Sequence, residues 1–312
     1  MKRVSFAEFG GPEVLHLTEA EEPHAGPGQI RIAVRAAGVN PVDWRIREGQ
    51  FRRTDHRDQS RQARQARQTH PSDLPSGTGQ DAAGLVDEIG PGVTTVEVGD
   101  RVFGRGSSTY AEFAVLSAWA PMPENLTFEE AAGYPSVVET ALRIIRQSGV
   151  QPGQNLLVSG ASGGVGSAVL QIARDRGITA IGTAGAANQD YLRSLGALAT
   201  TYGEGWVERV RRLGHVDAAL DLAGSGVIPD LVELTGDPQK VISIADLTAP
   251  EHGVRFSGVT GNVPQALAET ADLIARGRLH IPVEKTYQLT EAAAAQADSQ
   301  AGHTRGRRVI VI

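Results

Sequence analysis

The chain has 312 residues, a length that usually forms two domains with a core in each. Its formal net charge is −6, so we expect no general positive field that would bind DNA or an anionic membrane. The sequence contains no cysteine, which excludes disulfides, thiol nucleophiles and zinc sites built on thiolates, and which favours a reducing compartment.

The first third of the chain carries short strand patterns. Apolar and polar residues alternate from Gln29 to Val39, which is the period of a half-buried strand. Further strands are predicted at residues 85–89, 101–103 and 110–115, between turns rich in glycine and proline. The N-terminus shows no apolar signal segment, and no run approaches the roughly 18 apolar residues of a membrane span, so we expect a cytoplasmic protein outside the membrane.

A basic segment follows the first predicted strand. From Phe51 to His70 the chain is rich in arginine and glutamine, and after Phe51 its only apolar residues are alanines, so we predict a solvated surface segment. Contact with RNA or with the phosphates of a ligand is the alternative, although no aromatic residues are interleaved. The basic residues are Arg52, Arg53, Arg57, Arg61, Arg64 and Arg67.

The pattern changes near Phe128, where helical spacing begins and a second domain is predicted. Strands then alternate with helices of moderate length, which is typical of a doubly wound parallel sheet. The predicted strands are 155–158, 180–183, 218–222 and 241–245, and the predicted helices are 129–132, 137–146, 165–174 and 189–195. After a helix at 267–275, the apolar residues 309–312 are expected to return to a sheet as a strand.

A glycine-rich turn joins the first strand of this second domain to its helix. Its glycines 160, 163 and 166 permit a tight turn, close approach of a pyrophosphate and packing of the helix on the strand. The helix N-terminus would then meet the phosphate charge with free N–H groups. The predicted cofactor-binding residues of this turn are Ala161, Ser162, Gly163, Gly164, Val165 and Gly166.

The end of the next predicted strand indicates which cofactor is bound. An NAD site usually presents Asp or Glu there to the ribose 2′-hydroxyl. Here the residues from Gly182 to Asn188 contain no carboxylate, and Thr183 and Asn188 can donate to a 2′-phosphate. The sequence therefore favours NADP(H) over NAD(H).

Ser162 also fits a different chemistry. Gly160 to Gly164 satisfies the G-x-S-x-G pattern of a hydrolase nucleophile on a strand–turn–helix. A serine hydrolase is therefore a minor alternative, which replacement of Ser162 by alanine would test. The acid and base would come from Asp221, Asp246, His252, His280 or His303. The eight histidines show no paired spacing for metal ligands, so no metal site is predicted.

Four motifs together resemble the zinc-free quinone oxidoreductase, or zeta-crystallin-like, branch of the medium-chain dehydrogenase/reductase superfamily. They are Phe9–Leu15, the turn Ala37–Asp43, the turn Val98–Val102 and the glycine turn Ala161–Gly166. The resemblance implies a GroES-like β-barrel catalytic domain from residues 1–122 and 256–312, with an NADP-binding Rossmann domain at 123–255 between them. Zinc-dependent relatives have a cysteine near Asn40 and a histidine where this chain has Gln80, so the zinc site is not expected.

The resemblance implies NADPH-dependent hydride transfer to a quinone or an α,β-unsaturated carbonyl. Asn40 would stabilise the developing oxyanion, with capping of a turn as the alternative. Asp43 would orient the substrate or the cofactor ribose, with a solvent-facing carboxylate as the alternative. Tyr110 would donate a proton, with a packing residue as the alternative.

Further positions follow from the same resemblance. Thr140 would lie near the nicotinamide, with Ile244 and Ala245 as its wall, and Arg307 would be an ordinary surface charge where the family often has lysine. A homodimer is the family expectation. A non-catalytic NADPH-binding or RNA-binding protein is the alternative to an enzyme.

Overall fold

The computed structural model describes residues 1–50, 74–258 and 261–312. Their packing defines two compact units. The first contains Met1–Ser136, Asn262–Ala275 and Ile281–Ile312, and the second contains Val137–Gly261 and Arg276–His280. The domain boundaries expected after residues 122 and 255 stay a prediction.

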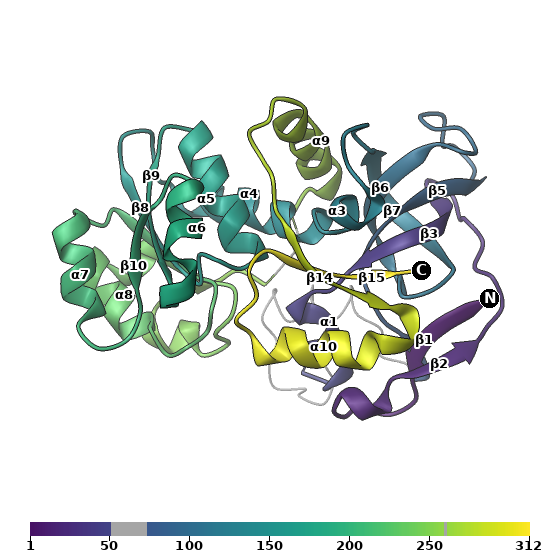
Figure 1. Cartoon of the computed structure of the whole chain (residues 1–312), viewed down its shortest axis with the longest axis horizontal. Helices are drawn as coiled ribbons and strands as arrows, with labels where there is room; N and C mark the ends of the chain where they lie inside the picture. Colours follow the sequence, from purple (N-terminus) through teal and green to yellow (C-terminus); the bar gives the residue numbers. More distant parts are fainter. Residues whose placement is uncertain (51–73, 259–260) are drawn as a thin grey trace. The chain divides into compact units, whose positions relative to one another are not determined.

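The first unit is built on a mostly antiparallel sheet that closes on itself (Figure 1). In the described residues its strand order is β14-β15-β3-β5-β6-β7, and an added pairing of β3 with β7 completes a barrel. The strands are β3 (Ile30–Gly38), β5 (Asp81–Ile89), β6 (Arg101–Ser107), β7 (Phe113–Pro121), β14 (Val283–Gln288) and β15 (Arg307–Val311). Because Ile30, Ile32 and Val34 alternate with polar residues, β3 fills the barrel core with one face.

Smaller elements complete the first unit. A second sheet has the order β2-β1-β4, and helix α1 packs against helix α10 from the C-terminal part of the chain. The remaining elements are β1 (Lys2–Phe6), η1 (Pro12–Val14), β2 (His16–Glu19), α1 (Pro41–Arg47), β4 (Ser76–Gly77), α3 (Phe128–Ala132), α9 (Val263–Ala275), η5 (Leu289–Glu291) and α10 (Ala292–Ala301).

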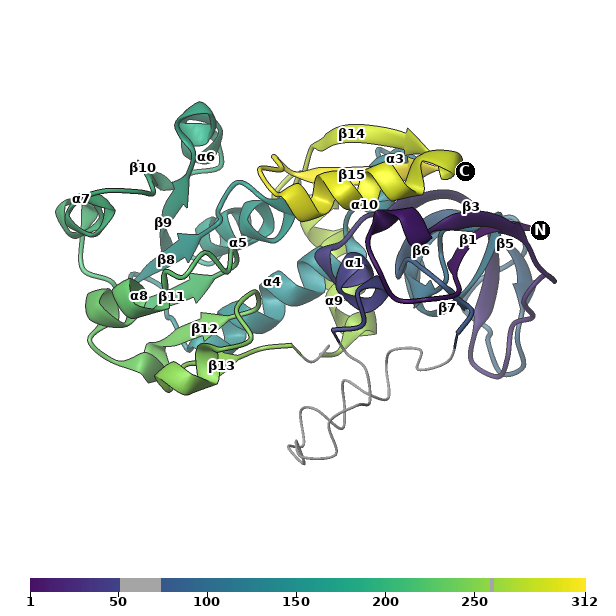
Figure 2. The ribbon, with the colours of Figure 1, turned by 90° about the horizontal axis from the view of Figure 1, so that it is seen from below.

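The second unit is a doubly wound parallel sheet of order β10-β9-β8-β11-β12-β13 among the described residues. Figure 2 shows α5 on one face of this sheet and α7 and α8 on the other. Its strands are β8 (Asn155–Ser159), β9 (Thr179–Ala184), β10 (Leu198–Thr201), β11 (Ala218–Asp221), β12 (Val241–Ser243) and β13 (Arg255–Phe256). Its helices are α4 (Pro135–Ser148), α5 (Gly164–Asp175), η2 (Ala186–Asn188), α6 (Gln189–Ser194), α7 (Trp206–Leu213), α8 (Ile228–Thr235), η3 (Pro238–Lys240) and η4 (Ala249–His252).

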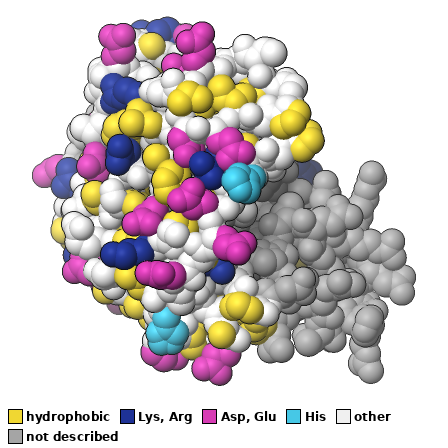
Figure 3. Space-filling model, turned by 90° about the vertical axis from the view of Figure 1, so that its right-hand side faces the viewer, with side chains coloured by type: hydrophobic (Ala, Val, Ile, Leu, Met, Phe, Trp, Pro, Cys, Tyr) yellow, Lys and Arg dark blue, Asp and Glu magenta, His cyan; other side chains and the backbone are white. Residues whose placement is uncertain are grey.

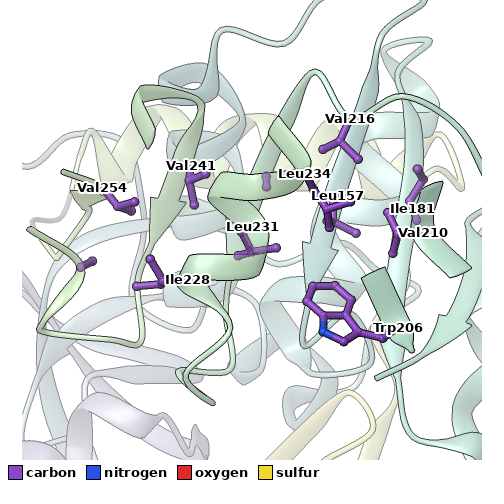
Figure 4. Packing of buried hydrophobic residues seen from close by; sticks show 12 residues of the cluster. Leu157, Ile181, Trp206, Val210, Val216, Ile228, Leu231, Leu234, Val241 and Val254 are labelled. Atoms are coloured by element: carbon purple, nitrogen blue, oxygen red, sulfur yellow. The ribbon is translucent and has the colours of Figure 1, made fainter. Parts of the chain in front are cut away.

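A buried apolar cluster holds α7 and α8 against this sheet (Figure 4). Leu157 and Ile181 of the strands are fully buried beneath Trp206 and Val210 of α7, while Leu231 of α8 is equally buried. Burial of such side chains stabilises a fold by about 2 kcal/mol each. This packing fixes the sheet from which the loops at its carboxyl edge extend. Cofactors bind at these loops in this architecture.

The predicted architecture of a barrel plus a parallel sheet is confirmed. Two predicted strand boundaries are wrong. The strand expected at 110–115 is β7, which begins at Phe113 and leaves Tyr110 in the preceding turn, and β12 ends at Ser243, which leaves Ile244 and Ala245 in a loop. Among the described residues, no helix combines the length and the apolar character that crossing a bilayer would need.

Candidate functional site

The candidate catalytic region of the first unit is the turn between β3 and α1. Pro41 occupies the first helical position, where its missing N–H costs nothing, and Asn40 precedes it in an extended conformation. The backbone N–H of Asn40 donates to Oδ2 of Asp43 at 2.8 Å. Local turn chemistry thus brings two predicted catalytic residues together.

The side-chain amide of Asn40 is held from two sides. Its Nδ2 donates to Oδ2 of Asp81 at 2.9 Å, and its Oδ1 accepts from Nη2 of Arg307 at 2.9 Å. Asp81 also accepts from the backbone N–H and the hydroxyl of Ser136, at 3.0 and 2.6 Å. An amide nitrogen carries two hydrogens, so one N–H of Asn40 is left without an acceptor in the part of the chain that is described.

Asp43 is a buried carboxyl with one free oxygen. Its Oδ2 accepts from the hydroxyl of Tyr110 at 2.9 Å, whereas its Oδ1 is buried without a hydrogen-bond partner among the described residues. Burial, with the nearby Asp81 as a further cause, raises the pKa of Asp43 to about 7. Burial also raises the pKa of Tyr110 well above its usual 10, so its hydroxyl stays a donor.

The structure corrects two predictions about these residues and adds two residues that the sequence did not indicate. Arg307 was expected to be a surface charge, which is wrong because it is only 5% exposed. The alternative of a solvent-facing Asp43 is also wrong, since 1% of this residue is exposed. Asp81 and Ser136 were not predicted, because the hydrogen bonds of Asp81 to Asn40 and to Ser136 join residues 41 and 55 positions apart.

The glycine turn is the candidate cofactor-binding region of the second unit. Gly160 has a φ of 79°, and a Cβ on Gly166 would lie 2.5 Å from the carbonyl oxygens of Gly160 and Ala161, so the fold itself requires both glycines. Gly163 is different. A Cβ there would meet only the carbonyl oxygen of Gly160, at 3.7 Å, so the space above Gly163 is open for a ligand.

The other predicted residues of this turn lie around it. Oγ of Ser162 accepts from Nδ2 of Asn188 at 3.4 Å, and the N–H of Ala161 donates to the carbonyl of Thr183 at 3.0 Å. Thr183 is only 2% exposed. No histidine of the described residues is hydrogen-bonded to Ser162, so nothing in its surroundings supports a hydrolase. Gly164 and Val165 begin helix α5, which aims its first N–H groups at the turn.

Ile244 and Ala245, the predicted nicotinamide wall, are held in place by the buried polar pair Ser243 and Asp221. Oγ of Ser243 donates to Oδ2 of Asp221 at 2.8 Å and accepts the N–H of Ala245 at 3.1 Å, while the N–H of Ile244 donates to the carbonyl of Asp221 at 3.1 Å. Thr140 lies in α4 and its Oγ1 accepts from Arg143 at 3.3 Å. In the described ranges, no group of three or more His, Asp or Glu side chains is placed to hold a metal ion.

Two family models match the chain. The model described as an alcohol dehydrogenase GroES-like domain matches residues 26–123, and the one described as a zinc-binding dehydrogenase matches residues 195–310. A quinone oxidoreductase of Rattus norvegicus is 39% identical over 191 residues, which are 59% of this chain and 53% of the relative, about half its length. A quinone oxidoreductase of Homo sapiens is 33% identical over 261 residues, which cover 82% of this chain and 71% of that protein.

Solved structures match over the whole chain. The quinone oxidoreductase from Coxiella burnetii has a TM-score of 0.84 and 29% identity, and the match covers 100% of this chain and 99% of that one. A mycobacterial protein complexed with NADPH has a TM-score of 0.81 and 26% identity, with 100% of both chains covered. These proteins therefore share the fold of this chain.

Proposed function

The chain belongs to the quinone oxidoreductase branch of the medium-chain dehydrogenase/reductase superfamily, and from this premise we propose that it transfers hydride from NADPH to a quinone or an α,β-unsaturated carbonyl without a metal ion. The expected family resemblance is thereby confirmed. The activity, the substrate and the cofactor are our proposal, supported by the features that follow.

The open space above Gly163 is the observation that carries the proposal. The protein itself leaves no side chain there, while α5 directs free N–H groups to the same turn. A pyrophosphate needs both features, because it must approach the backbone closely and have its charge compensated. The residues that would hold the cofactor are Ala161, Ser162, Gly163, Gly164, Val165, Gly166, Thr183, Asn188, Thr140, Ile244 and Ala245.

When bound, NADPH supplies the hydride. The chain's own residues must then stabilise the charge that develops on the substrate oxygen and deliver a proton. The unpaired N–H of the Asn40 amide is suited to the first task, because a donor fixed before the reaction stabilises an oxyanion without reorganising.

Asp43 is suited to the second task. With a pKa of about 7 it holds a proton in about half of the molecules near neutral pH. Asn40 and Tyr110 donate to Oδ2, so the proton resides on Oδ1, the oxygen without a partner. No hydrogen bond among the described residues holds this oxygen, so none has to break before the proton is transferred.

The residues present support a reaction without zinc. The sequence has no cysteine; zinc-dependent relatives have a cysteine near the turn that here contains Asn40, and a histidine where this chain has Gln80. Amide side chains are poor ligands for zinc, which prefers thiolate, imidazole and carboxylate. Charge stabilisation is therefore assigned to hydrogen-bond donors.

The RNA-binding alternative receives less support. Figure 3 shows a face on which acidic and basic side chains are intermixed, and its described residues form no single positive area. The arginine-rich segment 51–70, on which this alternative was based, lies outside the described residues. We also propose a cytoplasmic homodimer, as the family resemblance implies, which light scattering of the purified protein would test.

Steady-state oxidation of NADPH and of NADH with a simple 1,4-quinone and with a simple enone tests the proposed function. Cofactor binding is followed in parallel by nicotinamide fluorescence. We expect turnover that prefers NADPH with at least one acceptor. Tight NADPH binding without turnover would support the non-catalytic alternative, and absence of binding would overturn the assignment of the glycine turn.

A further inference from the structure

Arg307 is a charged residue enclosed by the first unit. It opens strand β15, is 5% exposed, and its Nη2 donates to Oδ1 of Asn40 from a position 267 residues away. Two glycines leave room for it. A Cβ on Gly38 would lie 3.1 Å from Nη2, and a Cβ on Gly133 would lie 3.1 Å from Cγ. The side chain of Arg307 thus packs closely against the backbone at both glycines.

The neighbours of Asn40 permit only one orientation of its amide. A guanidinium can only donate hydrogen bonds and an ionised carboxylate can only accept them. Arg307 therefore requires the amide oxygen on its side, and Asp81 requires the amide nitrogen on the other. In a flipped amide, the Asn40 oxygen would face the carboxylate of Asp81, and the Asn40 N–H groups would face those of Arg307. Both hydrogen bonds would then be lost.

We propose that Arg307 is a positioning residue, which fixes the Asn40 amide so that its second N–H always meets the substrate oxygen. The inference rests on the proposed function of Asn40 and adds a residue that acts through it. Without Arg307 the amide could rotate and spend part of its time with its oxygen toward a developing negative charge. The chemical step would then slow, because a donor helps only when it is oriented in advance.

Arg307 also sets the charge around Asn40. It faces the carboxyls of Asp81 from β5 and Asp43 from α1, with the hydroxyl of Tyr110 beside them, while Arg47 of α1 pairs with Glu48. Its positive charge lowers the pKa of Asp43 against the larger effect of burial. Loss of this charge is therefore expected to raise the pKa of Asp43 and to move the pH dependence of turnover upward, whereas the positioning of Asn40 is tested by the double variant below.

A set of variants tests the proposal, with kcat, KM for the quinone, the pH profile and the melting temperature measured for each. Asn40→Ala is expected to lower kcat about 100-fold, as loss of an oxyanion donor does. Arg307→Met is expected to lower kcat roughly tenfold, with little change in KM and a pH profile shifted upward. Arg307→Lys, which keeps a charged donor, should restore most of the loss.

The double variant Asn40→Ala/Arg307→Met decides whether Arg307 acts through Asn40. We expect the same kcat as for Asn40→Ala alone, because the second change then removes nothing further. Losses that multiply would overturn the role of Arg307 and leave the proposed function intact. A wild-type kcat in Asn40→Ala would instead overturn the proposed function of Asn40.

Two further variants separate positioning from folding. Arg307→Met deprives the buried Asp81 of the positive charge of Arg307, so Asp81→Asn/Arg307→Met serves as the folded version, in which an amide oxygen can still accept from Asn40. Its kcat should remain low, and a wild-type kcat would overturn the proposal. Arg308→Met is the matched control. It removes the same charge from the next residue of β15, whose side chain lies beside Glu284, and should leave kcat unchanged.

Discussion

The hydroxyl of Tyr110 donates to Oδ2 of Asp43 at 2.9 Å across 67 residues of sequence, and neither residue is more than 1% exposed. A buried carboxyl with a single hydroxyl and one backbone N–H as donors is poorly compensated as an anion. This arrangement explains why Asp43 retains its proton to a far higher pH than an exposed aspartate. It also makes the folding stability of the protein depend on the state of this one group.

The first prediction concerns stability against pH. The pKa of Asp43 is about 7 in the folded protein against a usual 3.8, so the folded state binds this proton more tightly. The contribution of Asp43 to the free energy of unfolding is fully present below about pH 4 and is lost as the pH rises through about 7. This loss is on the order of 4 kcal/mol. Asp43→Asn should therefore show a smaller decrease of the free energy of unfolding over this range in urea titrations.

Tyr110→Phe provides the control for this prediction. Removing the hydroxyl withdraws a hydrogen bond that lowers the pKa of Asp43, so the loss of stability should move to higher pH. A pH dependence that is the same in Asp43→Asn and in the wild type would contradict the assignment.

The second prediction separates two glycines of the cofactor turn. Gly163→Ala should fold with a melting temperature within about 2 °C of the wild type, because a Cβ there meets nothing closer than 3.7 Å and the backbone φ of −70° suits alanine. Its NADPH affinity should fall at least about tenfold, because the methyl group occupies the space reserved for the pyrophosphate. Fluorescence titration measures the affinity.

Gly166→Ala is the contrasting variant. Its Cβ would lie 2.5 Å from two carbonyl oxygens, so this change should destabilise the protein itself by about 1–3 kcal/mol. Unchanged NADPH binding in a well-folded Gly163→Ala would show that the phosphates lie elsewhere.

The sequence predicted those parts of the structure that depend on local patterns. The alternation in β3 and the glycine turn before α5 are both set by neighbours within a few positions, and both are found at the predicted place. The contact between Arg307 and Asn40 is different, because it joins the two ends of the chain. Its only local signal is that Arg307 lies two residues before Val309 and so shares the buried face of β15.

The third prediction tests the cofactor preference at the end of β9. Gly185 has a φ of −61° and a ψ of 160°, so it accepts other residues without strain, and a Cβ there would be 3.5 Å from the hydroxyl of Tyr202. Gly185→Asp should weaken NADPH at least about tenfold relative to NADH, because its carboxylate repels a 2′-phosphate and can accept from a 2′-hydroxyl. Gly185→Asn matches its size without the charge and should retain the NADPH preference. Equal effects of both variants would contradict the placement of the 2′-phosphate.

The fourth prediction concerns the hydroxyl of Ser162. Its partner is Asn188 at 3.4 Å, a weak contact, so Ser162→Ala should keep kcat for quinone reduction within about threefold. A hydrolase nucleophile would lose its activity altogether. Assay of the same variant with a simple aryl ester provides the second readout, and esterase activity of the wild type that disappears in Ser162→Ala would support the hydrolase.

The last prediction concerns the loop after β12. Oγ of Ser243 accepts the N–H groups of Ala245 and Asp246, at 3.1 and 2.9 Å, and donates to the buried Asp221. Ser243→Ala would remove these three hydrogen bonds, so we expect the loop to move, the protein to lose about 1–3 kcal/mol of stability, and NADPH binding to weaken roughly tenfold. Ser243→Thr keeps the hydroxyl and should retain more affinity than the alanine variant. If Ser243→Ala lost stability but bound NADPH as tightly as the wild type, Ile244 and Ala245 would not form the nicotinamide wall.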